Sequence, residues 1–320
     1  MKILIYANGG EKIGLGHIMR CLRLAFYLKG CDISFASDDK KWLSHGHELI
    51  KNAGFKLYKI PNHQALASLD AQILLIDSYD VRADFFTYIK NFFYKVVCID
   101  DECELKFYDV DLIINPNPYA STLPYKLSPR TKTLFGLLFL RTEFIKAKKI
   151  TINKNIKNIF LTLGGSDDKN LSYFIAKSIQ NYLLSRNVIL HIAIAKAFKY
   201  KKELLGLESS FIKCYENAPM AELMLGCDVG ICACGQTVYE FLSLGVPIIS
   251  FVLASNQKNL ALFGVHQGYL IFARPENIAM ELEKMSFETR LNLRANINQN
   301  FCPNFIDENF KTLLFTLLGL

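Results

Sequence analysis

The sequence of 320 residues lacks long hydrophobic runs, and no apolar stretch reaches the roughly 18 residues that a membrane-spanning helix requires. The apolar start, from Met1 to Tyr6, is too short for the apolar region of a signal peptide and leads directly into Asn8-Gly9-Gly10. We therefore interpret this start as a first strand. The sequence predicts a protein without a membrane span, and we expect it in the cytoplasm.

Cysteine pairs at metal-binding spacing are also missing. The chain has nine cysteines, an odd number, and no two of them form a CxxC pair. Most lie in apolar segments such as Val97-Cys98-Ile99, which favours buried, reduced thiols over disulfides or zinc ligands. The sequence predicts no metal site and no cofactor.

An excess of charge of one sign is present, but it is small. The net charge is +7, from 37 Lys and Arg against 30 Asp and Glu, and hydrophobic residues make up 51%. This composition excludes intrinsic disorder and allows a full core. The lysines are scattered and no basic-aromatic motif occurs, so we expect no nucleic-acid partner, although an anionic small molecule is favoured.

Short apolar runs alternate with amphipathic stretches along nearly the whole chain, a pattern typical of parallel sheets covered by helices. The sequence turns polar over residues 147–154, and then the pattern restarts. We predict an α/β protein with two doubly wound, Rossmann-like domains, residues 1–150 and 151–320, which face a cleft. The apolar face of residues 310–318 could lie on a membrane surface, but we favour a last helix that packs across the domain junction.

Twelve strand-like runs support this division. In the first half they are Ile3–Tyr6, Asp32–Ala36, Leu57–Ile60, Gln72–Ile76, Val96–Ile99 and Leu112–Ile114, with helices expected near 17–29, 40–52 and 83–93. In the second half they are Asn158–Leu163, Val188–Ala193, Phe211–Cys214, Val229–Cys232, Ile248–Val252 and Tyr269–Phe272.

A glycine-rich junction follows the first strand, at the carboxyl end where open parallel sheets bind ligands. Gly14 and Gly16 allow backbone N–H groups to approach a ligand closely, and the helix that follows favours negative charge. His17 would begin this helix, where a neutral imidazole could act as a general base. The alternative is a histidine that only caps the helix, but its place in a Gly-x-Gly-His sequence favours the functional interpretation.

A second junction opens the second half of the chain. Gly164, Gly165 and Ser166 follow a strand-like run and precede a helix, so their backbone N–H groups could hold an anion. Taken alone this signal is weak, because many strand-to-helix turns have a similar composition.

A third junction lies at residues 234–240. Gly235, Gln236 and Thr237 would begin a helix whose free N–H groups could bind phosphate. Glu240, one turn later, could accept hydrogen bonds from a diol such as ribose. A solvated carboxylate or a lysine partner is the alternative for Glu240.

The three junctions together resemble the two-domain UDP-sugar enzymes of glycosyltransferase-B fold. The stretch Ile13-Gly14-Leu15-Gly16-His17-Ile18-Met19-Arg20-Cys21-Leu22 is further similar to the nucleotide-sugar hydrolases of pseudaminic acid biosynthesis, which act on UDP-2,4-diacetamido-2,4,6-trideoxy-β-L-altropyranose. The same likeness includes Ile76-Asp77-Ser78-Tyr79, Ile99-Asp100-Asp101-Glu102, Asn115-Pro116-Asn117, Arg141-Thr142-Glu143-Phe144 and Asn256-Gln257, so it spans nearly the whole chain.

The resemblance implies hydrolysis of the glycosidic C1–O bond of a UDP-sugar without a metal, with His17 as the base that activates water. UDP would be bound by Gly16, Gly164, Gly165, Ser166, Gly235, Gln236, Thr237 and Glu240, and the sugar and phosphates by Gly14, Arg20, Tyr79, Asn256 and Gln257. The chemistry is compatible, because UDP leaves as a stabilised anion and asks for hydrogen-bond donors more than for a general acid. A UDP-sugar is thus the one partner that the sequence indicates. The sequence does not indicate an oligomeric state.

Two features depart from the family pattern. The family usually has Arg and Asp near the end of strand one, where this chain has Tyr6 and Asn8, and an Arg-Tyr or similar where this chain has the shortened Gly136–Leu140. Both concern the sugar side of the site. The main alternative function is a UDP-sugar-dependent glycosyltransferase of the same fold, since water and an acceptor hydroxyl need the same base. A non-catalytic UDP-sugar binding subunit is disfavoured because His17 is retained.

Overall fold

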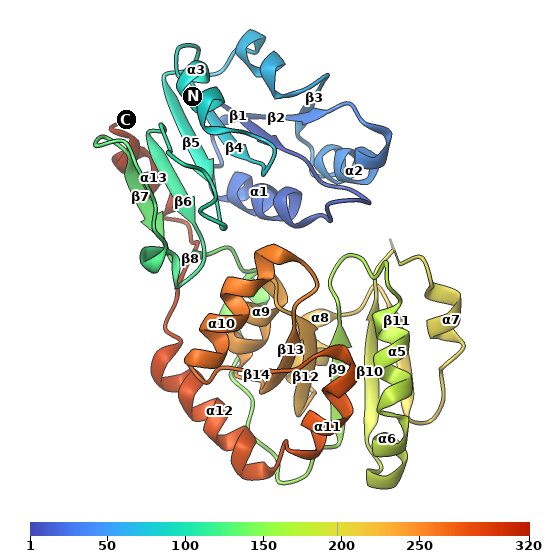
Figure 1. Cartoon of the computed structure of the whole chain (residues 1–320). Coiled ribbons are helices and arrows are strands. Elements are labelled where there is room, and N and C mark those ends of the chain that lie inside the picture. Colours follow the sequence, from blue (N-terminus) through green and yellow to red (C-terminus); the bar gives the residue numbers. More distant parts are fainter. Residues whose placement is uncertain (197) are drawn as a thin grey trace. The chain divides into compact units, whose positions relative to one another are not determined.

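The computed structural model describes residues 1–196 and 198–320, which form two compact units (Figure 1). The first domain comprises Met1–Phe139 and Pro303–Leu320, and the second comprises Leu140–Cys302. This division differs from the expected one in two ways: the chain leaves the first domain before residue 150, and its last segment returns to it.

The first domain is built on a seven-stranded parallel sheet in the order β3-β2-β1-β4-β5-β6-β7. Its strands are β1 (Lys2–Ala7), β2 (Asp32–Asp38), β3 (Lys56–Ile60), β4 (Ile73–Asp77), β5 (Lys95–Ile99), β6 (Leu112–Asn115) and β7 (Lys132–Phe135). The central strands are apolar on both faces, and all five residues of β4 are buried. Helices must therefore cover both faces, as in other parallel sheets.

Helices and short 3-10 turns cover this sheet. They are α1 (Gly16–Tyr27), η1 (Lys41–Leu43), α2 (Ser44–Asn52), η2 (His63–Ser68), α3 (Ala83–Ile89), η3 (Ala120–Thr122) and α13 (Phe310–Leu318). Phe310, Leu314 and Leu318 repeat every four residues and join α1 in one buried cluster. The last helix thus completes the core of the first domain, and the strand before it, β15 (Asn304–Phe305), pairs with β8 (Leu137–Leu138).

The second domain repeats the architecture with a six-stranded parallel sheet in the order β11-β10-β9-β12-β13-β14. Its strands are β9 (Asn158–Thr162), β10 (Ile189–Ile194), β11 (Ile212–Glu216), β12 (Val229–Ala233), β13 (Ile248–Phe251) and β14 (Ile271–Phe272). Its helices are α4 (Thr142–Lys146), α5 (Leu171–Ser178), α6 (Gln180–Arg186), α7 (Lys201–Leu205), α8 (Met220–Leu225), α9 (Gln236–Leu244), η4 (Ser255–Gln257), α10 (Lys258–His266), η5 (Pro275–Asn277), α11 (Ile278–Glu283) and α12 (Phe287–Asn300).

The predicted fold class, two doubly wound parallel sheets, is confirmed. Strand order reverses between β1 and β4 in the first sheet and between β9 and β12 in the second. Ligands of such sheets bind beyond the carboxyl ends of the strands at these reversals. The three glycine-rich junctions of the sequence follow β1, β9 and β12, so all three lie at these two positions. No helix within the described ranges combines the length and the apolar character needed to cross a bilayer.

Candidate active site

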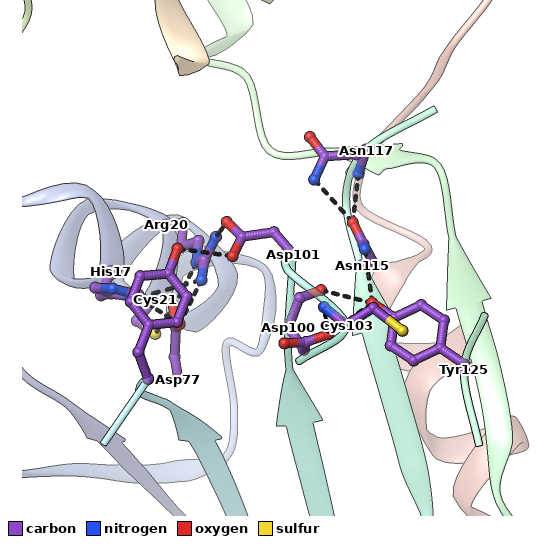
Figure 2. Close-up of polar contacts among 11 residues, drawn as sticks. His17, Arg20, Cys21, Asp77, Asp100, Asp101, Cys103, Asn115, Asn117 and Tyr125 are labelled. Carbon is purple, nitrogen blue, oxygen red and sulfur yellow. Dashed lines mark hydrogen bonds and ion pairs between the residues drawn. The ribbon is translucent and has the colours of Figure 1, made fainter. Parts of the chain in front are cut away.

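The first reversal point brings together His17 and Asp77. β1 leads through a loop to α1, whose second residue is His17, while Asp77 is the last residue of the neighbouring strand β4. The loop is anchored, because Gly10 N–H donates to the Gly14 carbonyl at 2.8 Å and a side chain at Gly10 would collide with the Trp42 backbone. His17 is 7% exposed and Asp77 is fully buried. Their contact, from His17 Nδ1 to Asp77 Oδ1, measures 2.6 Å (Figure 2).

The charge on Asp77 decides which nitrogen of His17 carries the proton. Burial raises the pKa of Asp77, but the nearby Arg20 guanidinium and His17 outweigh it and hold that pKa well below its usual value. The ionised carboxylate can only accept hydrogen bonds. The 2.6 Å contact therefore requires the proton on Nδ1, which leaves Nε2 with the lone pair in the neutral ring. The arrangement resembles the carboxylate–imidazole pair of hydrolytic triads, in which the carboxylate fixes the tautomer of the histidine.

Arg20 lies one turn after His17 on α1 and is paired with two carboxylates. Its Nε and Nη2 donate to Asp77 Oδ2 and Oδ1 at 2.5 Å each, and its Nη1 donates to Asp101 Oδ2 at 2.5 Å. Burial alone would lower the pKa of Arg20, yet Asp101 and Asp77 raise it well above the usual value. The sequence predicts Arg20 as a ligand of the sugar or the phosphates; in the structure its charge is already balanced within the first domain.

Asp101 and Tyr79 complete this group. Tyr79 OH donates to Asp101 Oδ1 at 2.7 Å, and the rings of Tyr79 and His17 meet edge to face with centroids 4.6 Å apart. The sequence predicts Tyr79 as a site residue, but it assigns no role to Asp77 or Asp101. A local signal was present, since Asp77 ends one apolar strand and Asp101 lies two residues after the end of another.

A second polar group lies beside Asp101, at the ends of β5 and β6 (Figure 2). Asp100 accepts hydrogen bonds from Tyr125 OH at 2.7 Å and from Cys103 N–H at 2.9 Å. Asn115 Nδ2 donates to Tyr125 OH at 2.7 Å. Burial raises the pKa of Asp100 despite these donors. The group fixes the turn that follows β5 and hence the position of Asp101.

Tyr6 and Asn8, two of the residues that depart from the pattern of the similar hydrolases, tie β1 to β2. Tyr6 OH donates to Asp38 Oδ1 at 2.8 Å, and Asn8 Oδ1 accepts from Ser37 Oγ at 2.8 Å and from Asp38 N–H at 2.9 Å. Tyr6 is fully buried and Asn8 is 3% exposed. Both residues therefore have a structural use within the first domain.

At the second reversal point, the loop after β9 contains Gly164, Gly165 and Ser166. The structure exposes both glycines, and a Cβ at Gly165 would meet no described atom within 4 Å. The helix that follows, α5, begins only at Leu171, and its first N–H groups are bound by Asp167, whose carboxylate accepts from Leu171 N at 2.7 Å. Any anion held here would thus be bound by the loop rather than by the start of α5.

The start of α9 has no side-chain cap comparable to Asp167. Gly235 is its N-cap without a side-chain hydrogen bond, and Gln236 and Thr237 form its first turn. Gln236 Nε2 is buried and has no hydrogen-bond partner among the residues that the structure describes. A buried donor of this kind is free to bind a water molecule or a polar ligand. Glu240 is only 6% exposed, which excludes the alternative of a solvated carboxylate.

The loop after β13 carries Asn256 and Gln257 in η4. Gln257 Oε1 accepts from Leu253 N at 2.8 Å, and its Nε2 lies 3.9 Å from the place of a Cβ on Gly235. Asn256 is exposed on the same turn. The structure thus brings Gln257 beside Gly235, as expected of loops that follow adjacent parallel strands. Within the described part of the chain, no group of three or more His, Cys, Asp or Glu side chains could hold a metal ion.

No family model matches the chain. Among curated proteins, it is 29% identical over 280 residues to the uncharacterized protein MJ1062 of Methanocaldococcus jannaschii, covering 80% of this chain and 56% of that protein. It is 27% identical over 285 residues to the UDP-2,4-diacetamido-2,4,6-trideoxy-beta-L-altropyranose hydrolase of Campylobacter jejuni, covering 84% of this chain and 98% of that protein. It is also 28% identical over 248 residues to a Helicobacter pylori protein named as pseudaminic acid cytidylyltransferase and the same hydrolase, of which it covers 43%.

Solved structures give the fold. The chain superposes on MurG of Acinetobacter baumannii with a TM-score of 0.66 at 14% identity, covering 99% of both chains. The spinosyn rhamnosyltransferase SpnG, solved with thymidine diphosphate, gives a TM-score of 0.61 at 14% identity and covers 98% of this chain. The glycosyltransferase-B fold and the resemblance to nucleotide-sugar hydrolases that the sequence indicates are thereby confirmed.

Proposed function

We propose that this chain hydrolyses the glycosidic C1–O bond of a UDP-linked deoxy-diacetamido sugar, releasing UDP and the free sugar for the synthesis of a pseudaminic-type acid. The observation that carries the proposal is the His17–Asp77 pair, an oriented base at the reversal point of a doubly wound sheet. The names of the Campylobacter and Helicobacter relatives supply the substrate class. All nine cysteines are free thiols, so we place the reaction in the cytoplasm.

In this reaction His17 Nε2 takes a proton from water as the water oxygen attacks C1. The C1–O bond breaks, its electron pair leaves with UDP, and the proton passes from the imidazole to solvent. Asp77 keeps the ring in the tautomer that can act as a base and compensates the positive charge that forms on it. The developing charge on UDP is stabilised by hydrogen-bond donors, so neither a metal nor another cofactor is needed.

UDP is held by the loops after β9 and β12. The backbone of Gly164, Gly165, Ser166 and Gly235 and the first turn of α9, with Gln236 and Thr237, supply donors for the phosphates. The unpartnered, buried Gln236 Nε2 supports this role. In this proposal Glu240, which is 6% exposed, accepts hydrogen bonds from the ribose hydroxyls.

We further propose that Gly14 and Tyr79 of the first domain, and Asn256 and Gln257 of the second, contact the sugar or the phosphates, and that Gly16 contacts UDP. Gly16 has neither a positive φ nor a described atom within 4 Å of a would-be Cβ, so the fold itself does not demand glycine there. A ligand that approaches the start of α1 closely would explain why residue 16 is a glycine. Tyr79 contributes its ring beside His17.

A UDP-sugar-dependent glycosyltransferase is the second candidate. The solved structures with this fold include glycosyltransferases that match 98–100% of the chain, and an acceptor hydroxyl would use the same base as water. The experiment that separates the two supplies purified protein with a panel of UDP-sugars, with and without sugar or lipid acceptors. Hydrolysis predicts equal amounts of UDP and free sugar without any acceptor, whereas UDP release that depends on an acceptor identifies a transferase.

A further inference from the structure

Five side chains of the first domain form a closed ring of contacts. His17 Nδ1 donates to Asp77, Asp77 accepts from Arg20, Arg20 donates to Asp101, and Asp101 accepts from Tyr79 OH. An edge-to-face contact between the Tyr79 ring and the His17 imidazole closes this circle of contacts. Each polar link measures 2.5–2.7 Å.

The imidazole is therefore supported at two places. Asp77 fixes Nδ1, while the Tyr79 ring, at 76° to the imidazole, restricts its rotation about the hydrogen bond. Arg20 and Asp101 contribute differently, because they connect these two supports to each other. The Arg20 side chain is only 12% exposed, and its planar fork places Asp77 and Asp101 at a fixed separation.

Hydrogen bonds of the preceding residue fix the backbone at Asp101. The preceding residue, Asp100, accepts from Cys103 N–H and from Tyr125, which makes the tight turn in which Cys103 adopts a positive φ of 58°. Asp101 thus leaves β5 from a fixed backbone, with its carboxylate directed at Arg20 (Figure 2). The same carboxylate accepts from Tyr79 OH. A fixed carboxylate between two donors is suited to transmit position rather than to bind a ligand.

We propose that Arg20 and Asp101 are positioning residues that couple Tyr79 to Asp77 and so hold His17 in one orientation for proton transfer. The proposal rests on the proposed function, because it gives His17 the role of base. Asp77 and Asp101 together carry two negative charges, and the Arg20 guanidinium carries one positive charge. The remaining negative charge compensates the positive charge that forms on His17 when it takes a proton from water.

The first test is a double-mutant cycle of Tyr79→Phe and Asp101→Asn. Asp101→Asn should lower kcat roughly 10–100-fold, as expected for a slightly misplaced base, with little change in KM. Tyr79→Phe removes only the hydroxyl and keeps the ring. If that hydroxyl acts through Asp101, the double variant should be no slower than Asp101→Asn alone. Fully multiplicative effects, or a raised KM with unchanged kcat, would overturn the coupling.

Matched controls are available in the same domain. Asp109 pairs with Lys90 at 2.8 Å, and its side chain is 23% exposed against 20% for Asp101. Asp109→Asn removes an equivalent ion pair and should leave kcat unchanged. Tyr94→Phe is the control for Tyr79→Phe, because Tyr94 is 66% exposed, and it should also leave kcat unchanged. Arg20→Lys keeps the positive charge but loses the fork, and it should behave like Asp101→Asn.

A second readout does not depend on activity. Nitrogen-15 NMR of the histidine side chains, with the His17 signal identified from its loss in His17→Asn, reports the environment of the ring. Asp101→Asn should shift the His17 signal although Asp101 bonds to Arg20 and Tyr79, and Asp109→Asn should leave it in place. An unmoved His17 signal in Asp101→Asn would refute the positioning role. Failure of the wild-type protein to release UDP from any UDP-sugar would instead refute the proposed function.

Discussion

Replacement of Asp77 by asparagine tests the orientation of the base most sharply, because the change keeps the shape of the side chain and removes its charge. Asp77 accepts from His17 Nδ1 at 2.6 Å and from Arg20 Nε and Nη2 at 2.5 Å each, and it is fully buried. An amide NH₂ group cannot accept, so at least one of these donors loses its partner. It can also donate to Nδ1, which would move the imidazole proton to Nε2 and abolish the base.

The expected losses follow from these contacts. Breaking a buried, charge-assisted network costs about 3–5 kcal/mol, and the retained Arg20–Asp101 contact offsets part of it, so we expect about 2–4 kcal/mol of unfolding free energy. The wrong tautomer should lower kcat by up to roughly 10⁴-fold, the value known for the same substitution in a serine protease triad. Urea denaturation and steady-state rates of UDP release measure the two effects on one preparation.

The acid dependence of the stability loss follows from the lowered pKa of Asp77. A carboxyl with a lowered folded-state pKa contributes its full stability above the unfolded value of about 3.9, and the contribution is lost only as pH falls below it. The stability difference between wild type and Asp77→Asn should therefore stay constant at neutral pH and shrink in acid.

Asp228→Asn is the matched control. Asp228 is 4% exposed and accepts from Asn153 Nδ2, Lys157 N–H and Asn158 N–H in the second domain, whereas His17 belongs to the first. It should lower stability and leave kcat intact. Equal rates in Asp77→Asn and wild type would refute the argument that Asp77 sets the tautomer of His17.

Four further outcomes are expected. His17→Asn should lower turnover by roughly 10²–10⁴-fold; unchanged turnover would leave the mechanism without a base. Glu240→Ala should weaken UDP binding by about 1–3 kcal/mol in a calorimetric titration, and no preference for UDP over adenine nucleotides would count against the assigned uridine site. A chelator should leave the rate unchanged, and a loss restored by a divalent ion would contradict the metal-independent mechanism. Burial, with Glu104, Asp101 and Asp100 nearby, raises the pKa of Glu102 to about 7, so ionisation of Glu102 destabilises the folded state as pH rises toward 7. Glu102→Gln should therefore gain stability relative to wild type over that range, and a difference that does not vary with pH would contradict this.

The sequence predicts the sheets well because strands buried on both faces are continuous apolar runs, of which Ile73–Ile76 is an example. All twelve strand-like runs are present. The edge strand β7 was missed because Lys132 and Thr133 are exposed and leave no apolar run. The return of α13 to the first domain was not predicted either, since an apolar helix face does not specify which core it completes.

For the site, the glycine-rich junctions and His17 were accessible from local composition and position after strands. Asp77 and Asp101 were not assigned, because their roles arise from lateral neighbours in the sheet, and strand order is not written in the local sequence. For the same reason, the sequence does not predict the ion pairs of Arg20. Its spacing from His17 indicates a shared helix face, but only the structure shows the two carboxylates that bind its guanidinium.

Hydrolysis in water enriched in oxygen-18 tests the central claim most directly. If water attacks C1 and the C1–O bond breaks, the bridging oxygen stays on the β-phosphate, so mass spectrometry should find the released UDP without label. UDP release should also require no acceptor and should be lost in His17→Asn. Oxygen-18 in the β-phosphate of the released UDP would show cleavage of the phosphate–oxygen bond and would contradict the account.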